Sequence, residues 1–266
     1  MAIRALHTGA SGMNANMFNL DVIANNLANA GTTAFKRSRA NFEDMIYQQI
    51  KLPGTQTTAG QLTPIGSSVG LGTRLQSTQL DFVTGTPIAT GRPLDLMILG
   101  EGFFGVSDGT EITYTRAGNM TVNDAGALVL ASADRGRLID PPITIPPNAI
   151  NISISGDGVV SYMQQGTPDP IQAGTINLFR FINPQGLIQR GDNLYSPSPA
   201  SGTAQLANPG QDGAGTLSQG FLESSNVEPV KELVELIKTQ RNFELNSQSV
   251  QAADQALQLV ANLRRF

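Results

Sequence analysis

The stretch of this sequence that comes closest to a cofactor-binding pattern is Gly100-Glu101-Gly102-Phe103-Phe104-Gly105, which has the spacing of a dinucleotide-binding loop. Such a loop must follow a strand and open a helix, because the helix N-terminus receives the pyrophosphate. Here Val106, Ser107 and the turn pair Asp108-Gly109 follow, and they continue as strand and turn. We therefore interpret these glycines as shaping a hairpin or a bulge, and we expect no nucleotide cofactor.

Other catalytic patterns are also weak. The sequence has no cysteine, which excludes disulfides, thiolate metal sites and cysteine nucleophiles. Its one histidine, His7, lies next to an apolar position near the start of the chain, where a Ser–His–Asp triad is not expected. Oxygen-only calcium binding at Asp157 or Asp192 lacks the dense ligand spacing of calcium loops. We predict no catalytic residue, no cofactor and no metal.

Carboxylates offer one alternative of a different class, a periplasmic protein that binds or cleaves glycans. A glycosidase needs two carboxylates flanking the scissile bond. Nothing in the sequence selects two of the available carboxylates as such a pair, and we interpret them as solvated side chains in turns. They are Asp95, Glu101, Asp108, Glu111 and Asp124.

Composition favours a structural or interaction protein. The 266 residues include 17 basic and 21 acidic side chains, and this charged share of 14% is well below the usual value of about 25%. The net charge of −4 argues against a nucleic-acid binder. No apolar run approaches the roughly 20 residues of a membrane helix, so no membrane insertion is expected. The start of the chain lacks the continuous apolar stretch of a cleaved secretory signal.

Both ends of the chain predict long helices that need a partner. Over residues 1–30, apolar side chains recur in steps of three and four: Ile3, Leu6, Ala10, Met13, Met17, Leu20, Ala24 and Leu27. From residue 227 onward, with Asn226 expected as the N-cap, a second seam contains Leu233, Leu236, Ile237, Phe243, Val250, Leu257 and Val260. Two interpretations stay open, a hairpin of helices in an ordinary core and a coiled-coil stalk that carries a globular insert.

The middle of the chain predicts β structure. Turn signals such as Asn123-Asp124 and Gly156-Asp157-Gly158 separate the candidate strands, which are 94–99, 103–106, 112–115, 127–130, 150–155, 159–163 and 175–182. Two flanking stretches, 53–72 and 196–220, are rich in Gly, Ser, Thr and Pro. We expect them to be disordered linkers, or loops ordered only by contact with other molecules.

Several motifs resemble bacterial flagellar rod and hook proteins. The N-terminal ones are Ser11-Gly12-Met13, the run from Asn19 to Asn29, and Phe35-Lys36-Arg37. The central ones are Leu94-Asp95-Leu96, residues 100–104, Tyr114-Thr115-Arg116-Ala117-Gly118, Asn183-Pro184-Gln185-Gly186-Leu187 and Gly191-Asp192-Asn193-Leu194-Tyr195. The C-terminal ones are the run from Gln219 to Val227, Thr239-Gln240-Arg241 and Asn246-Ser247. Length and a modest β insert are most similar to the distal rod members. One departure is Ala34, which stands where the family commonly has glycine, at a cost of about 1 kcal/mol if that backbone has positive φ.

The resemblance implies an α+β fold in which long N- and C-terminal helices pair as a coiled coil around an inserted, mainly antiparallel β domain. The expected parts are a terminal coiled-coil core (1–30 plus 227–266), an extended connecting region with a long loop (31–72) and an outer β domain (73–226). The implied function is a distal rod subunit that self-assembles through the two seams into a hollow helical drive shaft. A proximal rod or hook protein is the alternative within the family.

The resemblance also implies partners and a location. The partners are many copies of the chain, the proximal rod and hook proteins, the surrounding peptidoglycan and outer-membrane rings, and the flagellar type III export apparatus. The location is the basal body between periplasm and outer membrane, reached without a cleaved signal. The long loop would lie between subunits, and its candidate residues are Pro53, Gly54, Gly60, Pro64, Gly66, Gly70 and Gly72.

Overall fold

The computed structural model describes residues 2–56, 61–62, 64–132 and 136–263. Within these, the chain forms two compact units. Unit 1 comprises residues 1–28, 38–79 and 228–266, and unit 2 comprises residues 29–37 and 80–227. The chain is α+β, with one helix near each end and antiparallel strand pairing between them, as predicted. Neither described helix combines the length and the apolarity needed to cross a membrane.

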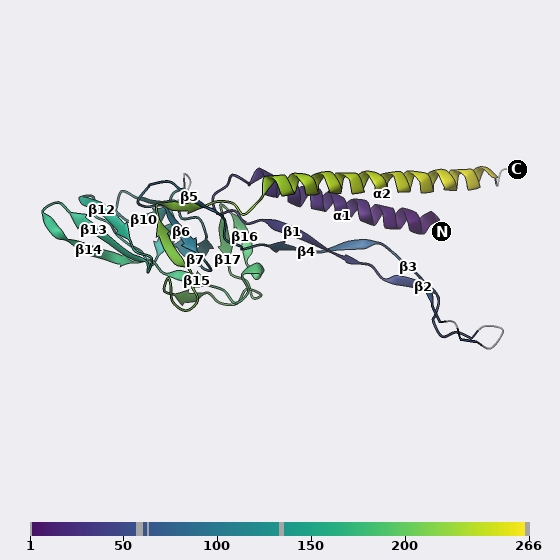
Figure 1. Ribbon diagram of the computed structural model, residues 1–266, viewed down its shortest axis with the longest axis horizontal. Helices are drawn as coiled ribbons and strands as arrows, with labels where there is room; N and C mark the ends of the chain where they lie inside the picture. The colour runs from purple at the N-terminus through teal and green to yellow at the C-terminus, as the bar shows by residue number, and fades with distance from the viewer. Residues whose placement is uncertain (1, 57–60, 63, 133–135, 264–266) are drawn as a thin grey trace. The chain divides into compact units, whose positions relative to one another are not determined.

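Unit 1 contains the two helices, α1 (Ala2–Ala28) and α2 (Pro229–Leu263), which lie side by side (Figure 1). It also contains two strand pairs. β1 (Ser38–Asp44) pairs with β4 (Thr73–Leu80), and β2 (Tyr47–Lys51) pairs antiparallel with β3 (Ser67–Gly70).

The helices confirm the predicted elements but begin and end slightly differently. Proline occupies the first position of α2, where its missing N–H costs nothing. The predicted N-cap at Asn226 is wrong. The side-chain oxygen of Asn226 accepts the backbone N–H of Arg37 at 2.7 Å, and its amide donates to the carbonyl of Asp81 at 2.8 Å, so this side chain is already engaged before the helix begins.

Unit 2 is built from short strands. In its described part, the largest sheet has nine strands, and its continuous path runs β16-β17-β8-β7-β11-β10-β9, with β15 pairing with β7 and β18. These strands are β7 (Phe103–Ser107), β8 (Ile112–Thr115), β9 (Met120–Val122), β10 (Leu128–Leu130), β11 (Leu138–Asp140), β15 (Leu178–Arg180), β16 (Ile188–Gly191), β17 (Leu194–Ser196) and β18 (Gln205–Ala207).

Smaller sheets complete unit 2. β12 (Ala149–Ile154), β13 (Val159–Gln164) and β14 (Thr167–Thr175) form one sheet, β6 (Leu96–Leu99) pairs with β19 (Thr216–Gln219), and β5 (Pro87–Ala89) pairs with β20 (Phe221–Glu223). A short 3-10 turn spans Pro184–Gly186. Apolar side chains from several of these sheets form one core, in which Leu96, Ile98, Phe104, Leu128 and Leu178 are fully buried.

Most predicted strands are confirmed to within one or two residues, and two expectations are wrong. The candidate strand 175–182 is divided, because β14 ends at Thr175 and β15 begins only at Leu178. The stretches 53–72 and 196–220 are not simply linkers. The first contains β3, and the second contains β18 and β19, with Ser201 fully buried.

Candidate assembly interface

The two helices are antiparallel and meet through polar side chains. The amide of Asn19 donates a hydrogen bond to the Thr239 hydroxyl at 3.0 Å, and the amide of Asn26 donates to Glu232 Oε2 at 3.2 Å. Asn26 and Glu232 are each 1% exposed, and Thr239 is 3% exposed, so these bonds lie inside the contact. Asn26 also accepts the backbone N–H of Ser38 at 2.9 Å, which ties the start of β1 to the helices.

Two glycines allow the helices to approach closely. A Cβ atom added to Gly9 would lie 2.6 Å from Val250 Cγ2, and one added to Gly12 would lie 2.8 Å from Asn246 Nδ2. Both distances are far below van der Waals contact. Glycine is a poor helix former, so its use at these two positions follows from the close packing rather than from helix propensity.

The apolar seam predicted on α1 lies beside this polar contact. Four members spaced by seven residues are half-buried: Leu6, Met13, Leu20 and Leu27. Three others, also spaced by seven, are exposed: Ala10, Met17 and Ala24. Met17 is 52% exposed. The side chain of Ile3 lies outside the described residues.

The seam predicted on α2 divides in the same way. Leu236, Phe243, Val250 and Leu257 are half-buried, whereas Leu233 and Ile237 are 45% and 63% exposed. The side chain of Val260 lies outside the described residues. Both helices therefore keep apolar side chains uncovered after they have paired with each other.

The β2–β3 hairpin exposes a second apolar surface, which we call the hairpin surface and define by Ile46, Ile50, Leu52, Leu62 and Ile65. Their exposed fractions run from 54% to 83%. Every residue of β2 is exposed. A hairpin of this kind is marginally stable alone in water, so these side chains lack the burial that a stable ribbon needs.

The candidate loop residues lie along this hairpin. Pro53, Gly54 and Pro64 are exposed, and Gly54 has φ +81°. A Cβ at Gly66 would meet the carbonyl of Lys51 at 2.7 Å, and one at Gly70 would meet the ring of Tyr47 at 3.2 Å, so both glycines let the strands of the hairpin close. Gly60 lies outside the described residues.

At its other end, the hairpin region contacts α1. Gly72 has φ +116°, and a Cβ there would overlap the hydroxyl of Ser11. The same hydroxyl accepts the backbone N–H of Thr73 at 3.3 Å. The Ser11 hydroxyl therefore anchors the start of β4 to α1. Ser11 belongs to Ser11-Gly12-Met13, one of the motifs that carry the family resemblance.

Unit 2 contains a buried charge cluster, Lys36, Arg116 and Glu223. Lys36 Nζ lies 2.6 Å from Glu223 Oε1, and Arg116 Nε lies 3.0 Å from Glu223 Oε2. The side chains of Lys36 and Glu223 are 0% exposed and that of Arg116 is 2% exposed. Three resemblance motifs, distant in sequence, supply the three charges.

Burial and charge act in opposite directions on this cluster. Burial lowers the pKa of Lys36, and it outweighs the nearby Glu223 carboxylate, so the pKa stays below the ordinary 10.5. Burial alone would raise the pKa of Glu223. The charges of Arg116 and Lys36, with the backbone N–H of Gly85 at 2.9 Å, outweigh it and hold the pKa below the ordinary 4.5.

Sequence reasoning did not single out these three residues as a site. The available signal was their presence as charged residues inside motifs of a chain that is otherwise poor in charge. Their contact is not readable from spacing, since Lys36 and Glu223 are 187 positions apart.

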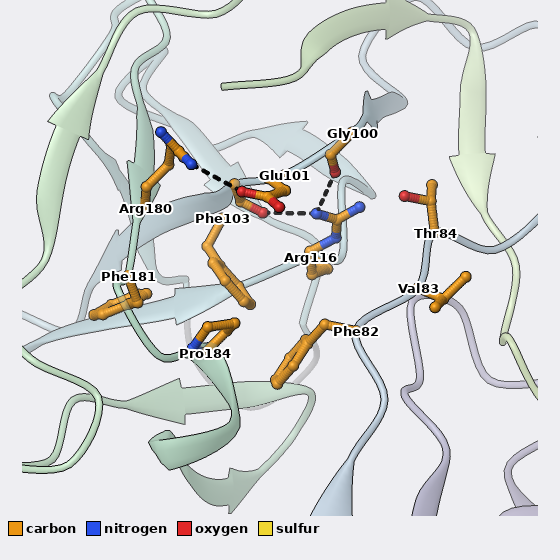
Figure 2. Close-up of a pocket in the computed structure, with 11 residues that line it drawn as sticks. Phe82, Val83, Thr84, Gly100, Glu101, Phe103, Arg116, Arg180, Phe181 and Pro184 are labelled. Carbon is orange, nitrogen blue, oxygen red and sulfur yellow. Dashed lines mark hydrogen bonds and ion pairs between the residues drawn. The ribbon is translucent and has the colours of Figure 1, made fainter. Parts of the chain in front are cut away.

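The glycine-rich loop at residues 100–105 faces a guanidinium group (Figure 2). Arg116 Nη1 donates to the carbonyls of Gly100 and Gly102, each at 2.8 Å. A phosphate-binding loop points N–H groups at its ligand, whereas here two carbonyls are directed at a cation. The chemistry therefore opposes a dinucleotide site, and Gly102, with φ +136°, serves the turn between β6 and β7.

Beside this loop lies a cavity of about 370 Å³ in unit 2, lined on one side by Phe82, Phe103, Phe181 and Pro184 (Figure 2). Its two arginines are both ion-paired, although Arg180 Nε has no hydrogen-bond partner among the described residues. Arg180 is paired with Glu101 at 2.9 Å, and Arg116 is engaged by Glu223 and backbone carbonyls. The wall offers packing surface rather than groups poised for acid–base chemistry.

Two of the five carboxylates considered for glycan cleavage are paired with arginines on the protein surface. Glu101 pairs with Arg180, and Glu111 pairs with Arg190 at 3.0 Å.

Comparison with known proteins identifies relatives for all three regions of the chain. Residues 6–36 match the family model described as flagella basal body rod protein. Residues 97–162 match the flagellar hook protein FlgE/F/G D1 domain, and residues 218–263 match the flagellar basal body rod FlgEFG protein C-terminal model.

Full-length relatives give the same result. The chain is 44% identical to the flagellar basal-body rod protein FlgG of Caulobacter vibrioides, over 98% of this chain and 100% of that protein. It is 42% identical to the protein of the same name from Borreliella burgdorferi, over 99% of each chain. It is 39% identical to FlgG of Bacillus subtilis, over 99% of this chain and 100% of that protein.

Proposed function

The chain belongs to the FlgG family of flagellar basal-body rod proteins, and from this premise we propose that it self-assembles into the distal rod, a hollow helical shaft that transmits torque from motor to hook. Family membership makes the chain a structural subunit of the rod and not an enzyme.

The observation that carries the proposal is the set of apolar side chains left uncovered on α1 and α2. Met17 and Ile237 are 52% and 63% exposed although both belong to the predicted seams. Burying such side chains stabilises by roughly 1.5–3 kcal/mol each. In a rod of identical subunits the covering surface is another copy, so α1 and α2 pair as a coiled coil and their remaining apolar positions form the self-assembly seam.

The hairpin surface supports a second contact between copies. Apolar side chains on a thin ribbon gain order only when something covers them. Contacts made head to tail between identical subunits generate an open helical array when the rotation does not close. We place the segment from Pro53 to Gly72 between neighbouring subunits, where it opposes bending of the shaft.

The remaining expectations belong to this proposal. Residues 1–30 and 227–266 form the axial core, residues 31–72 connect it, and residues 73–226 form the outer domain. The rod subunits contact proximal rod and hook proteins and pass through the peptidoglycan and outer-membrane rings. They are exported by the flagellar type III apparatus without a cleaved signal. A proximal rod or hook role is the alternative, and the FlgG names of the relatives above do not favour it.

Met17→Asp tests the seam. Because Met17 is half-exposed in the single chain, the substitution should leave the thermal unfolding of the subunit unchanged. In a dry interface between copies the same carboxylate costs several kcal/mol, so rods should not assemble and cells should not swim. Asn14→Asp places the same charge on an exposed position of α1 as a control. Normal motility with Met17→Asp would show that this seam does not join subunits.

A further inference from the structure

The contact between α1 and α2 repeats with a period of seven residues on both helices. The pairs Asn26–Glu232 and Asn19–Thr239 are hydrogen-bonded, and Gly12 lies against Asn246. Each step of seven along α1 corresponds to a step of seven in the opposite direction along α2. We call these three pairs the polar layers.

On α2, apolar side chains occupy the positions between the polar layers. Gly9 lies against Val250. Continued in steps of seven, the same alignment places Asn16 level with Phe243 and Ile23 level with Leu236.

The apolar positions of α2 do not distinguish one alignment from the next. Leu236, Phe243, Val250 and Leu257 recur every seven residues, so a slip of one heptad, about 10 Å at 1.5 Å per residue, replaces one apolar side chain by another. A repeat of this kind fixes which faces meet but not which heptad meets which.

The polar layers do distinguish the alignments. A slip that moves Asn246 level with Ala5 brings Thr239 level with Gly12, which offers no side-chain partner, and moves Asn26 beyond the first residue of α2. Thr239 and Asn26 then lose their hydrogen bonds to the opposite helix, although Thr239 keeps its bond to the carbonyl of Glu235 and Asn26 keeps its bonds to Ser38. An apolar layer would not incur the loss of these bonds between the helices. A slip the other way sets Val250 against Asn16 and Asn246 against Asn19, where no glycine leaves room.

We propose that the polar layers, with Gly9 and Gly12, select a single register of α1 on α2. This inference rests on the proposed assembly function, because a helical polymer needs every copy to present the same uncovered apolar side chains at the same height. Buried polar groups at such positions lower stability relative to apolar ones while fixing the register.

The absence of cysteine from the chain makes the register directly measurable. One cysteine is fixed on α2 by Asn242→Cys, outside the polar layers. Ala15 lines the same pocket as Asn242, so Ala15→Cys reports the observed register, and Thr8→Cys reports the register slipped by one heptad. Oxidation of dilute full-length protein, read as an intrachain band, measures both without requiring rods.

The polar layers are removed by three substitutions made together: Asn19→Leu, Thr239→Val and Glu232→Leu. The matched control makes corresponding changes at exposed positions of the same helices: Asn14→Leu, Gln248→Val and Glu244→Leu. We expect the ratio of slipped to observed crosslink to rise about tenfold or more in the first background and to stay unchanged in the control.

The midpoint of thermal unfolding distinguishes a role of the polar layers in fixing the register from a role in stabilising the helix pair. Removal of the polar layers should keep or raise this midpoint, because the changes at Asn19 and Thr239 make an apolar pair and Asn26 keeps its hydrogen bonds to Ser38. If only the observed crosslink forms after the polar layers are removed, the proposal is overturned. The register would then be set by the chain segments that join α1 and α2 to the rest of the protein. Failure of the Ala15→Cys and Asn242→Cys pair to crosslink in the otherwise unmodified chain would overturn the proposal as well. Since these readouts come from single chains, they are independent of whether the seam proposal holds.

Discussion

Lys36 and Glu223 form a buried ion pair with 2.6 Å between Nζ and Oε1, although 187 positions separate them in the sequence. Lys36 lies in the segment that follows α1, and Glu223 is the last residue of β20. The ion pair therefore joins two distant parts of the chain within unit 2. Arg116 adds a second cation to the same carboxylate from the middle of the β structure. The three motifs that supply these charges are thus held together by one carboxylate.

Removal of the carboxylate should destabilise unit 2 strongly. Glu223→Gln leaves two buried cations without their counter-ion, and we expect a loss of about 3–5 kcal/mol in unfolding free energy, measured by denaturant titration. Lys36→Met should cost less, because Arg116 still neutralises the carboxylate. Glu101→Gln is the control, since the Glu101 side chain is 78% exposed and its pair with Arg180 is worth about 1 kcal/mol or less. Equal losses for Glu223→Gln and Glu101→Gln would contradict the role of burial.

The same carboxylate predicts a pH dependence. Its pKa is lower in the folded chain than the ordinary 4.5, so the unfolded chain binds the proton more readily. The stability that Glu223 contributes is therefore complete above pH 4.5 and is lost as the pH falls through the folded pKa. Denaturant titrations below pH 4.5 should show a shallower decline for Glu223→Gln than for the unmodified chain. If the unfolding free energies of both proteins declined in parallel, other carboxylates would govern the loss of stability at low pH.

Ala34 adopts the left-handed backbone conformation, with φ +58°, while 1% exposed, and its N–H donates to the carbonyl of Glu223 at 2.8 Å. Ala34→Gly relieves strain of about 1 kcal/mol but removes a buried methyl worth about 0.8 kcal/mol, so its net effect should be small. Ala34→Val adds a β-branched side chain to a buried left-handed position and should cost roughly 1–3 kcal/mol or more from overpacking alone. Ala125→Val, in an exposed turn, is the control for denaturant midpoints. A Val variant as stable as its control would show that the backbone relaxes there.

The hairpin surface predicts a mechanical effect. Leu62→Asp combined with Ile65→Asp changes side chains that are 64% and 83% exposed, so the subunit should fold with unchanged stability. If neighbouring copies cover these side chains, the added charges weaken that contact, and rods should become curved or flexible in electron micrographs of basal bodies. Gln56→Asp charges an exposed position of the same hairpin as a control. Rods as straight as the unmodified ones would assign the hairpin another task.

The elements of this chain could be predicted because each leaves a local pattern. Ile112–Thr115 is a strand with the bounds that its turn signals predict, and both terminal helices appear where apolar residues recur in threes and fours. The positive φ at Ala34, raised as a possibility by the departure from the family pattern, is confirmed.

The contacts between distant elements could not be predicted in the same way. Apolar periodicity registers only hydrophobic side chains. The centre of the contact between α1 and α2 is instead formed by hydrogen bonds of Asn19 and Asn26, and by Gly12, whose small size lets the helices approach. Asn226 resembles an N-cap in sequence, but its side chain is used by Arg37 and Asp81, which no local window contains. The roles of the seam and of the loop residues between subunits remain predictions.

The hydrogen bonds of Asn226 have an evolutionary and practical consequence. Its side chain joins Arg37 and Asp81, and the backbone N–H of Asp81 donates to the carbonyl of Arg37 at 2.9 Å. Residues 82–225 therefore leave and return at almost one point, and segments whose ends lie close together are those that proteins exchange, enlarge or lose most readily. A shorter turn, a larger insert or a reporter domain placed between these positions would keep the spacing at which the chain continues. It would also have to replace the contacts that Glu223 makes with Lys36 and Ala34.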